Sequence, residues 1–173
     1  CCVIDSGIDY SHPAFRNSDG TTRIYRLWDQ SIANGTPPDN YFIGSEYTWE
    51  DINEALSKNN IQDMYSVVPS RDLSGHGTHV AGIIGAANNK KGVVGIAYNT
   101  KIMAIKAGNA SGYFNQSDIA EAVIYAYENG ADVINMSFGG GAISIEAMDA
   151  LQKAYTRCVL VAAAGNSGEP NEL

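Results

Sequence analysis

Short apolar runs rich in β-branched residues alternate along this chain with segments of helical periodicity. The strand-like runs are CCVI (1–4), KIMAIKA (101–107), ADVINMSF (131–138) and CVLVAAA (158–164). The helical segments are THVAGIIGAA (78–87), SDIAEAVIYAYENG (117–130) and SIEAMDALQKAYTR (144–157). Because the runs do not alternate apolar with polar residues, both faces of each strand should be buried. The pattern predicts a three-layer α/β fold, in which a mostly parallel sheet is covered by helices on both faces.

The composition restricts the possible partners. The chain has 173 residues, 45% hydrophobic and 17% charged, which is typical of one globular domain with a sizeable core. Its formal net charge is -8 and it contains no run of Lys or Arg, so we expect no nucleic-acid partner. No apolar stretch reaches the roughly 20 residues of a bilayer span, so we expect no membrane partner.

Residues 16–70 interrupt the alternation. They contain a β-type run, TTRIYRLWDQS (21–31), and later a helical segment, TWEDINEALSKN (48–59). In the helical segment, Thr48 and Asp51 have the spacing of a capping box. We therefore interpret 16–70 as an insertion at the rim of the sheet, with its second half helical.

Polar residues stand where several strand-like runs end. Asp5 follows the first run, SFGGG (137–141) closes the third, and GNSG (165–168) follows the fourth, while His76 opens a helical segment. Ligands of parallel sheets gather at the carboxyl ends of the strands, so these residues should meet at one edge. From the residues alone, His76 could be a general base or could form a metal pair with His79. The metal pair lacks a third ligand such as the glutamate of HExxH.

Five blocks of the chain, in this order, resemble the signature blocks of the subtilisin-like serine proteases (subtilases, peptidase family S8). They are VIDSGIDYSHP (3–13), GHGTHVAGIIG (75–85), VVGIAYNTKIMAIKA (93–107), DVINMSFGGG (132–141) and AAAGNSG (162–168). The insertion, with HPAF, DGTTRI and EYTWEDINEAL, looks more like the clostridial, Csp-like branch found in spore-forming bacteria. The resemblance implies a subtilisin-like fold across the whole chain.

The resemblance also implies catalytic roles. Asp5 would be the aspartate of an Asp-His-Ser triad, His76 its general base, and Asn166 the donor of the oxyanion hole. The family's nucleophile lies in a Gly-Thr-Ser-Met-Ala block that this sequence does not contain. We therefore expect 1–173 to be a partial catalytic domain, truncated at both ends and inactive by itself. The implied activity of the whole protein is that of a serine endopeptidase.

Two segments resemble the edges that hold substrate in the family. Their residues are Ser111, Gly112, Tyr113 and Phe114 on one side and Ser137, Phe138 and Gly139 on the other. An extended peptide would pair with both edges through its backbone, for which the glycines leave room. Because neither segment carries a charge, we expect an apolar or aromatic residue before the cleaved bond.

Three further expectations follow from the resemblance. AANNKKGVV (86–94) matches the family's calcium loop in length and has Asn89 at a ligand position, but Ala14 replaces the partner aspartate. We therefore expect no metal or other cofactor, with calcium near Asn89 improbable. The partner should be a protein or peptide substrate, and the location secreted, cell-envelope or spore-associated. A catalytically silent binding or scaffold domain of the same fold stays an alternative, because fold alone does not define function.

Overall fold

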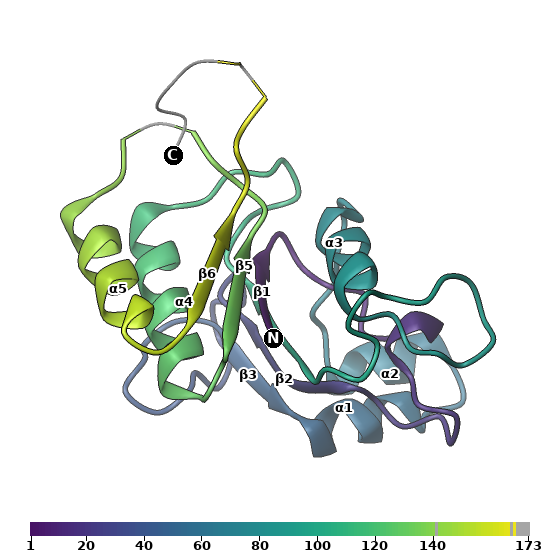
Figure 1. Cartoon of the computed structure of the whole chain (residues 1–173). Coiled ribbons are helices and arrows are strands. Elements are labelled where there is room, and N and C mark those ends of the chain that lie inside the picture. Colours follow the sequence, from purple (N-terminus) through teal and green to yellow (C-terminus); the bar gives the residue numbers. More distant parts are fainter. Residues whose placement is uncertain (141, 167, 169–173) are drawn as a thin grey trace.

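The computed structural model describes residues 1–140, 142–166 and 168 (Figure 1). These residues form a six-stranded sheet in the order β3-β2-β4-β1-β5-β6. The strands are β1 (Cys2–Asp5), β2 (Ile24–Asp29), β3 (Ser45–Thr48), β4 (Ile102–Lys106), β5 (Val133–Met136) and β6 (Val159–Ala162). Neighbouring strands are parallel, except that β3 is antiparallel to β2. The mostly parallel sheet predicted from the sequence is confirmed.

Helices cover both faces of this sheet, as Figure 1 shows. The helices α4 (Gln116–Glu128) and α5 (Ile145–Tyr155) pack against each other on one face. The other face carries α1 (Trp49–Leu56), α2 (Ile61–Val67), α3 (His76–Gly85) and a short 3-10 turn, η1 (Pro13–Phe15). The predicted three-layer architecture is confirmed.

The central strand β1 separates two apolar cores. Cys2 and Ile4 belong to the core under α4 and α5, whereas Val3 belongs to the core under α1, α2 and α3. All four residues of β1 are buried, which is why its sequence shows no apolar–polar alternation. Successive side chains of a strand point to opposite faces, so Asp5 lies on the same face as Val3, toward α3.

Helix starts follow local capping chemistry. Thr48 and Asp51 form the predicted capping box at the start of α1, since each side chain bonds the backbone of the other residue. Ser144 caps α5 by accepting a hydrogen bond from the backbone of Ala147.

Residues 16–70, which the sequence predicts to be an insertion at the rim, contribute two strands to the sheet itself. β3 is an edge strand, but β2 lies inside the sheet, between β3 and β4. Ile24, Leu27 and Trp28 of β2 are completely or almost completely buried. The second half of the segment is helical, as predicted, and forms α1 and α2.

One strand departs from the expectation of burial on both faces. In β6, Val159 is 61% exposed and Val161 is 44% exposed, while Leu160 packs against the core under α4 and α5. Within the described ranges, nothing covers the second face of β6, because α1, α2 and α3 lie over the β1, β2 and β4 side of the sheet. A search of the described residues for helices of membrane-spanning length and hydropathy finds none.

Candidate active site

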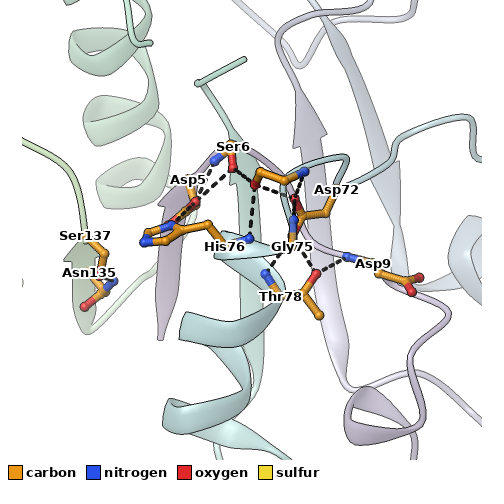
Figure 2. A network of polar contacts seen from close by, with 10 residues as sticks. Asp5, Ser6, Asp9, Asp72, Gly75, His76, Thr78, Asn135 and Ser137 are labelled. Carbon is orange, nitrogen blue, oxygen red and sulfur yellow. Dashed lines mark hydrogen bonds and ion pairs between the residues drawn. The ribbon is translucent and has the colours of Figure 1, made fainter. Parts of the chain in front are cut away.

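Asp5 is the last residue of β1, at the carboxyl edge of the sheet. Its side chain is 2% exposed. One of its oxygens, Oδ1, accepts a hydrogen bond from the backbone N–H of Ser6 at 2.8 Å. The chain then turns through Gly7 in a left-handed conformation, with φ of 134°. This sharp turn leaves the Asp5 carboxylate facing the start of α3 (Figure 2).

His76 is the first residue of α3 and meets this carboxylate. Its ring nitrogen Nδ1 lies 2.8 Å from Asp5 Oδ1 and 3.0 Å from Oδ2. An ionised carboxylate only accepts hydrogen bonds, so Nδ1 carries the hydrogen of this contact, and in the neutral ring Nε2 then has the free lone pair. The His76 side chain is 53% exposed, whereas Asp5 is buried. The structure thus brings together the two residues that the strand order predicted to be neighbours, and directs a basic nitrogen toward solvent.

The small residues of α3 explain how the helix approaches so closely. Gly77 packs on Asp5 and on the carbonyl oxygen of Gly7, where a β-carbon would overlap that oxygen. Ala81, one turn further along, is completely buried. Gly77 and Ala81 are therefore the small residues that let α3 lie close to β1.

A second carboxylate, that of Asp72, organises the loop before α3. Its Oδ1 accepts hydrogen bonds from Ser74 N, Ser74 Oγ and Gly75 N, and its Oδ2 accepts from Thr78 N and Thr78 Oγ1. Partial burial would raise the pKa of Asp72, but the bonds from Thr78, Ser74 and Gly75 outweigh it, and the pKa is lowered. Asp72 therefore caps the amino end of α3 and holds His76 in place.

The sequence reasoning did not identify Asp72, Ser74 or Ser6 as site residues. Ser6 and Ser74 connect Asp5 to Asp72 through their hydroxyl groups (Figure 2). The signal was present in the stretch RDLSGHGTH (71–79), where an aspartate and a serine precede the helix start. Such residues bond the free N–H groups of helix starts.

Asn166 lies in the loop after β6, at the same carboxyl edge of the sheet as Asp5. The segment after β6 is joined to the end of β5, the neighbour of β1, because Ala163 N donates to the Met136 carbonyl at 3.1 Å. The Asn166 side chain is exposed and, within the described residues, makes no hydrogen bond that would fix it. Its oxyanion role stays a prediction.

Most of the predicted substrate-binding residues line one apolar cleft. The cleft has a volume of about 300 Å³. Its lining includes Gly112, Tyr113, Phe114, Phe138 and Gly139 from the predicted edges. Residues from α4, β5 and α5 close its floor, among them Ile119, Met136 and Leu151. Two segments that lie far apart in the sequence therefore line a single cleft.

The two walls meet through aromatic stacking. The rings of Phe114 and Phe138 stack with centroids 4.2 Å apart and an angle of 24° between planes. The wall that carries Phe114 folds back on itself, since Gly108 pairs with Phe114 in an antiparallel bridge. A β-carbon on Gly108 would lie 2.5 Å from the Phe114 ring, so a larger residue there would displace this ring from its stack.

Ser111 and Ser137 do not line the cleft. Ser111 is exposed in the turn, where its backbone N–H donates to Asn109 Oδ1 at 2.9 Å. Ser137 follows β5, and its hydroxyl oxygen accepts a hydrogen bond from Asn135 Nδ2 at 2.9 Å. Figure 2 shows Asn135 and Ser137 on the far side of the Asp5–His76 pair from Asp72.

The metal pair considered from the sequence has no support in the described residues. His79 is exposed on α3. The described residues contain no group of three His, Cys, Asp or Glu side chains that could hold a metal ion. His76 instead bonds Asp5.

The side-chain amide of Asn89 is engaged at both ends by protein groups. Asn89 Nδ2 donates to the Pro13 carbonyl at 2.8 Å and reaches the Arg16 carbonyl at 3.3 Å, and Oδ1 accepts from Lys91 N at 3.1 Å. Calcium requires six to eight oxygen ligands, usually including carboxylates, and the side chains of Ala14 and Lys91 supply no carboxylate. The side chain of Asn89 thus links the loop at residues 86–94 to the carbonyl groups of Pro13 and Arg16.

A larger cavity, of about 580 Å³, lies away from this site. Thr22, Arg23, Lys101 and other residues next to the amino ends of β2 and β4 line it. Its lining residues stand at the opposite end of the strands from Asp5, and size alone gives it no chemistry. We therefore regard the carboxyl edge as the functional site.

The three-layer fold, with the Asp5–His76 pair at the carboxyl edge of its sheet, defines an α/β protein with a paired Asp–His site. The Subtilase family model matches residues 1–173, and the chain belongs to this family. A thermophilic serine proteinase from Bacillus sp. (strain AK1) is 36% identical over 168 residues, covering 96% of this chain and 32% of that protein. Subtilisin DY from Bacillus licheniformis is 50% identical over 98 residues, covering 56% of this chain and 36% of that protein.

Solved structures agree with this assignment. The CspB protease of Clostridium perfringens has a TM-score of 0.78 and 32% identity, covering 97% of this chain and 35% of that one. Sphericase has a TM-score of 0.68 and 28% identity, covering 98% of this chain and 47% of that one. The similarity to CspB agrees with the resemblance of residues 16–70 to the Csp-like branch. The chain spans about a third of the length of the curated relatives named above.

Proposed function

We propose that this chain carries the aspartate and the general base of a serine endopeptidase. The observation that carries the proposal is the 2.8 Å contact between His76 Nδ1 and the buried Asp5 carboxylate, which in the neutral ring leaves Nε2 free to accept a proton. A base in this tautomer can take the proton of a serine hydroxyl as that hydroxyl attacks a peptide carbonyl. Asp5 would then stabilise the imidazolium through the same hydrogen bond.

Asn166 is the proposed donor to the negative oxygen that develops on the attacked carbonyl. Its support is its position after β6, at the edge that also carries Asp5, and the family resemblance of the block AAAGNSG (162–168). A side-chain amide aimed at that oxygen stabilises charge that is present only in the transition state. His76 would afterwards return its proton to the leaving amine.

The proposed substrate is an extended protein or peptide segment lying between the two walls of the cleft. Gly112 and Gly139, one on each wall, have no side chain to keep a peptide backbone away. Phe114, Phe138 and Ile119 offer apolar surface and no charge. These features favour apolar or aromatic side chains in the cleft.

The nucleophile is proposed to come from a segment of the protein outside these 173 residues. The chain contains no Gly-Thr-Ser-Met-Ala block, and its relatives are about three times as long as the part they share with it. Ser137 already bonds Asn135 and follows a strand without opening a helix.

The test uses the protein at its full natural length with a fluorophosphonate probe, which labels activated serines. We expect stoichiometric labelling and peptide hydrolysis, both lost in His76→Ala and Asp5→Asn. His79→Ala, an exposed histidine on the same helix, is the matched control and should retain both. A full-length protein that folds but neither labels nor hydrolyses peptides would instead support the silent binding domain.

A further inference from the structure

Two serine hydroxyls, those of Ser74 and Ser6, lie in a row between the carboxylates of Asp72 and Asp5. Ser74 Oγ is 2.9 Å from Asp72 Oδ1, the two hydroxyl oxygens of Ser74 and Ser6 are 2.7 Å apart, and Ser6 Oγ is 3.2 Å from Asp5 Oδ1. Asp5 Oδ1 is also the oxygen that lies 2.8 Å from His76 Nδ1. A continuous row of polar contacts therefore joins Asp72 to the Asp5–His76 pair.

This row has three gaps between oxygen atoms and only two hydroxyl hydrogens to fill them. Ionised carboxylates contribute no hydrogen. The central gap is the shortest, and two oxygens at 2.7 Å would repel each other without a hydrogen between them. One hydrogen must therefore occupy the central gap. The other can occupy only one of the two outer gaps, so both hydroxyls point toward Asp72 or both point toward Asp5.

The distances favour the direction toward Asp72. Hydrogen bonds between oxygens usually span about 2.5–3.0 Å. The Ser74–Asp72 gap of 2.9 Å lies inside this range and the Ser6–Asp5 gap of 3.2 Å lies outside it. Asp5 Oδ1 also already accepts from Ser6 N and lies next to His76 Nδ1. Ser6 then donates to Ser74, and Ser74 donates to Asp72.

We propose that Ser74 is a positioning residue which holds the Ser6 hydroxyl away from Asp5, so that Asp5 keeps its full charge for a protonated His76. If Ser6 donated to Asp5, that hydrogen bond would stabilise the carboxylate by itself and weaken its attraction for the imidazolium. Asp72, which does not touch His76, sets the direction of both hydroxyls because it is the stronger acceptor for Ser74. The inference rests on the proposed function, in which His76 is the base.

The elements around the pair carry other charged and titratable groups: Asp9, Arg71, Asp72, His79 and Lys106. The two cations, Lys106 and Arg71, are engaged elsewhere. Lys106 is paired in register with Asp5, but its ammonium donates to the Arg71 carbonyl at 3.0 Å and lies 3.4 Å from Asp29. The Arg71 guanidinium lies over the Tyr65 ring, 3.9 Å from its centroid. The two serines are thus the direct polar connection between Asp72 and Asp5.

The test uses serine variants, which change no charge, in the full-length protein. Ser74→Ala removes the hydroxyl oxygen that accepts from Ser6 and, at 3.0 Å, from the His76 backbone N–H. The Ser6 hydroxyl should then turn to Asp5, and the double variant below, which also lacks the contact to His76 N, separates the two effects. The midpoint of the NMR titration of the His76 ring should then fall by about half a pH unit or more. Ser6→Ala should move it little, and Ser6→Ala combined with Ser74→Ala should restore the original midpoint, because no hydroxyl is left to donate.

Two controls separate positioning from a general loss of structure. Ser74→Thr keeps a hydroxyl and should keep the midpoint. Ser66→Ala removes a hydroxyl that donates to the Asp63 carbonyl on α2, away from the pair, and should also leave it unchanged. The acidic limb of the pH profile of kcat/KM should shift with the NMR midpoint in each active variant.

Two results would overturn the proposal. One is that Ser74→Ala shifts the midpoint equally in the unsubstituted protein and in the Ser6→Ala variant. The other is that Ser74→Ala shifts the midpoint in neither. Because the NMR titration reads the ring directly, it does not require peptidase activity. A shift that depends on Ser6 in a protein without activity would uphold the hydroxyl row and remove the proposed function. Activity that depends on His76 without such a shift would do the reverse.

Discussion

Gly77 lies directly against Asp5, so closely that a β-carbon on Gly77 would be 2.9 Å from the β-carbon of Asp5 and would overlap the Gly7 carbonyl oxygen. This contact sets the distance between α3 and β1. It therefore also sets the distance between His76, the neighbour of Gly77 in sequence, and the Asp5 carboxylate.

Gly77→Ala should therefore push α3 away from β1. We expect the free energy of unfolding to fall by roughly 1–3 kcal/mol, the usual cost of forcing an extra methyl group into a packed site, and activity to be lost. Gly82→Ala is the matched control on the same helix, because a β-carbon there meets nothing within 4 Å. It should raise stability by about 0.5–1 kcal/mol, since alanine favours a helix more than glycine does. Urea unfolding measures both, and an unaffected Gly77→Ala variant would contradict the packing argument.

Asn166→Ala in the full-length protein should lower kcat by about two to three powers of ten and change KM much less. The reason is that the amide would act on charge present only in the transition state. Steady-state kinetics on a peptide substrate provide the measurement. Asn59→Ala, in the exposed segment 57–60 after α1, is the control. A loss carried by KM alone would refute the oxyanion role.

Phe138→Ala should widen the apolar cleft and change its preference for substrate side chains. Removing one ring of the 4.2 Å stack leaves space beside Phe114, so bulky aromatic side chains should gain in kcat/KM relative to small ones. A peptide library compares the variant with the unsubstituted protein. Phe42→Ala, at a ring that is 92% exposed outside the cleft, should leave the profile unchanged. A preference for Lys or Asp before the cleaved bond in the unsubstituted protein would contradict the apolar assignment.

Asp72 should make stability depend on pH at the acid end. Its pKa in the folded protein is lowered below its ordinary value of 3.8, so its stabilising effect is fully present above that value. The effect disappears as the pH falls through the lower, folded-state pKa. Asp72→Asn should therefore lower the midpoint of urea unfolding at pH 7, and the difference from the unsubstituted protein should shrink below about pH 3.8. Asp39→Asn, at an exposed loop residue, serves as control, and a difference that grows on acidification would reverse the argument.

The loop linked by Asn89 should not depend on calcium. We expect a chelator to leave the stability contributed by this loop, and thus the thermal unfolding midpoint, unchanged. Asn89→Ala should lower stability by about 0.5–1.5 kcal/mol through loss of the bond to the Pro13 carbonyl. Asn88→Ala, at the preceding residue, is the control. A calcium-dependent rise in the midpoint that Asn89→Ala abolishes would show that the amide takes up a metal after all.

Several features were predictable because they depend on local sequence. The pattern of apolar residues reports burial along a strand or helix, so the order of elements and the parallel sheet could be predicted. The carboxyl ends of parallel strands share one edge, which was enough to place Asp5 and the start of α3 together. The capping box of Thr48 and Asp51 depends only on residues three apart.

Other features could not be predicted from such patterns. β2 lies inside the sheet and not at its rim, because its pairing with β4 joins residues about 77 positions apart. Ser111 and Ser137 fall outside the cleft, although their neighbours line it, because the turn at Asn109 and the bond from Asn135 direct them elsewhere. Val159 and Val161 have the apolar character of a buried strand but are exposed.

The sequence by itself therefore determined the α/β class, the order of its elements and the identity of the Asp5 and His76 candidates. The tertiary structure decided that these two side chains meet at 2.8 Å, with Gly77 as the close contact that allows it. It also decided that Ser6 and Ser74 connect the pair to Asp72. The physical reason is that periodicity and capping act over a few residues. Hydrogen bonds between residues about 70 positions apart depend on how closely a helix packs against a strand.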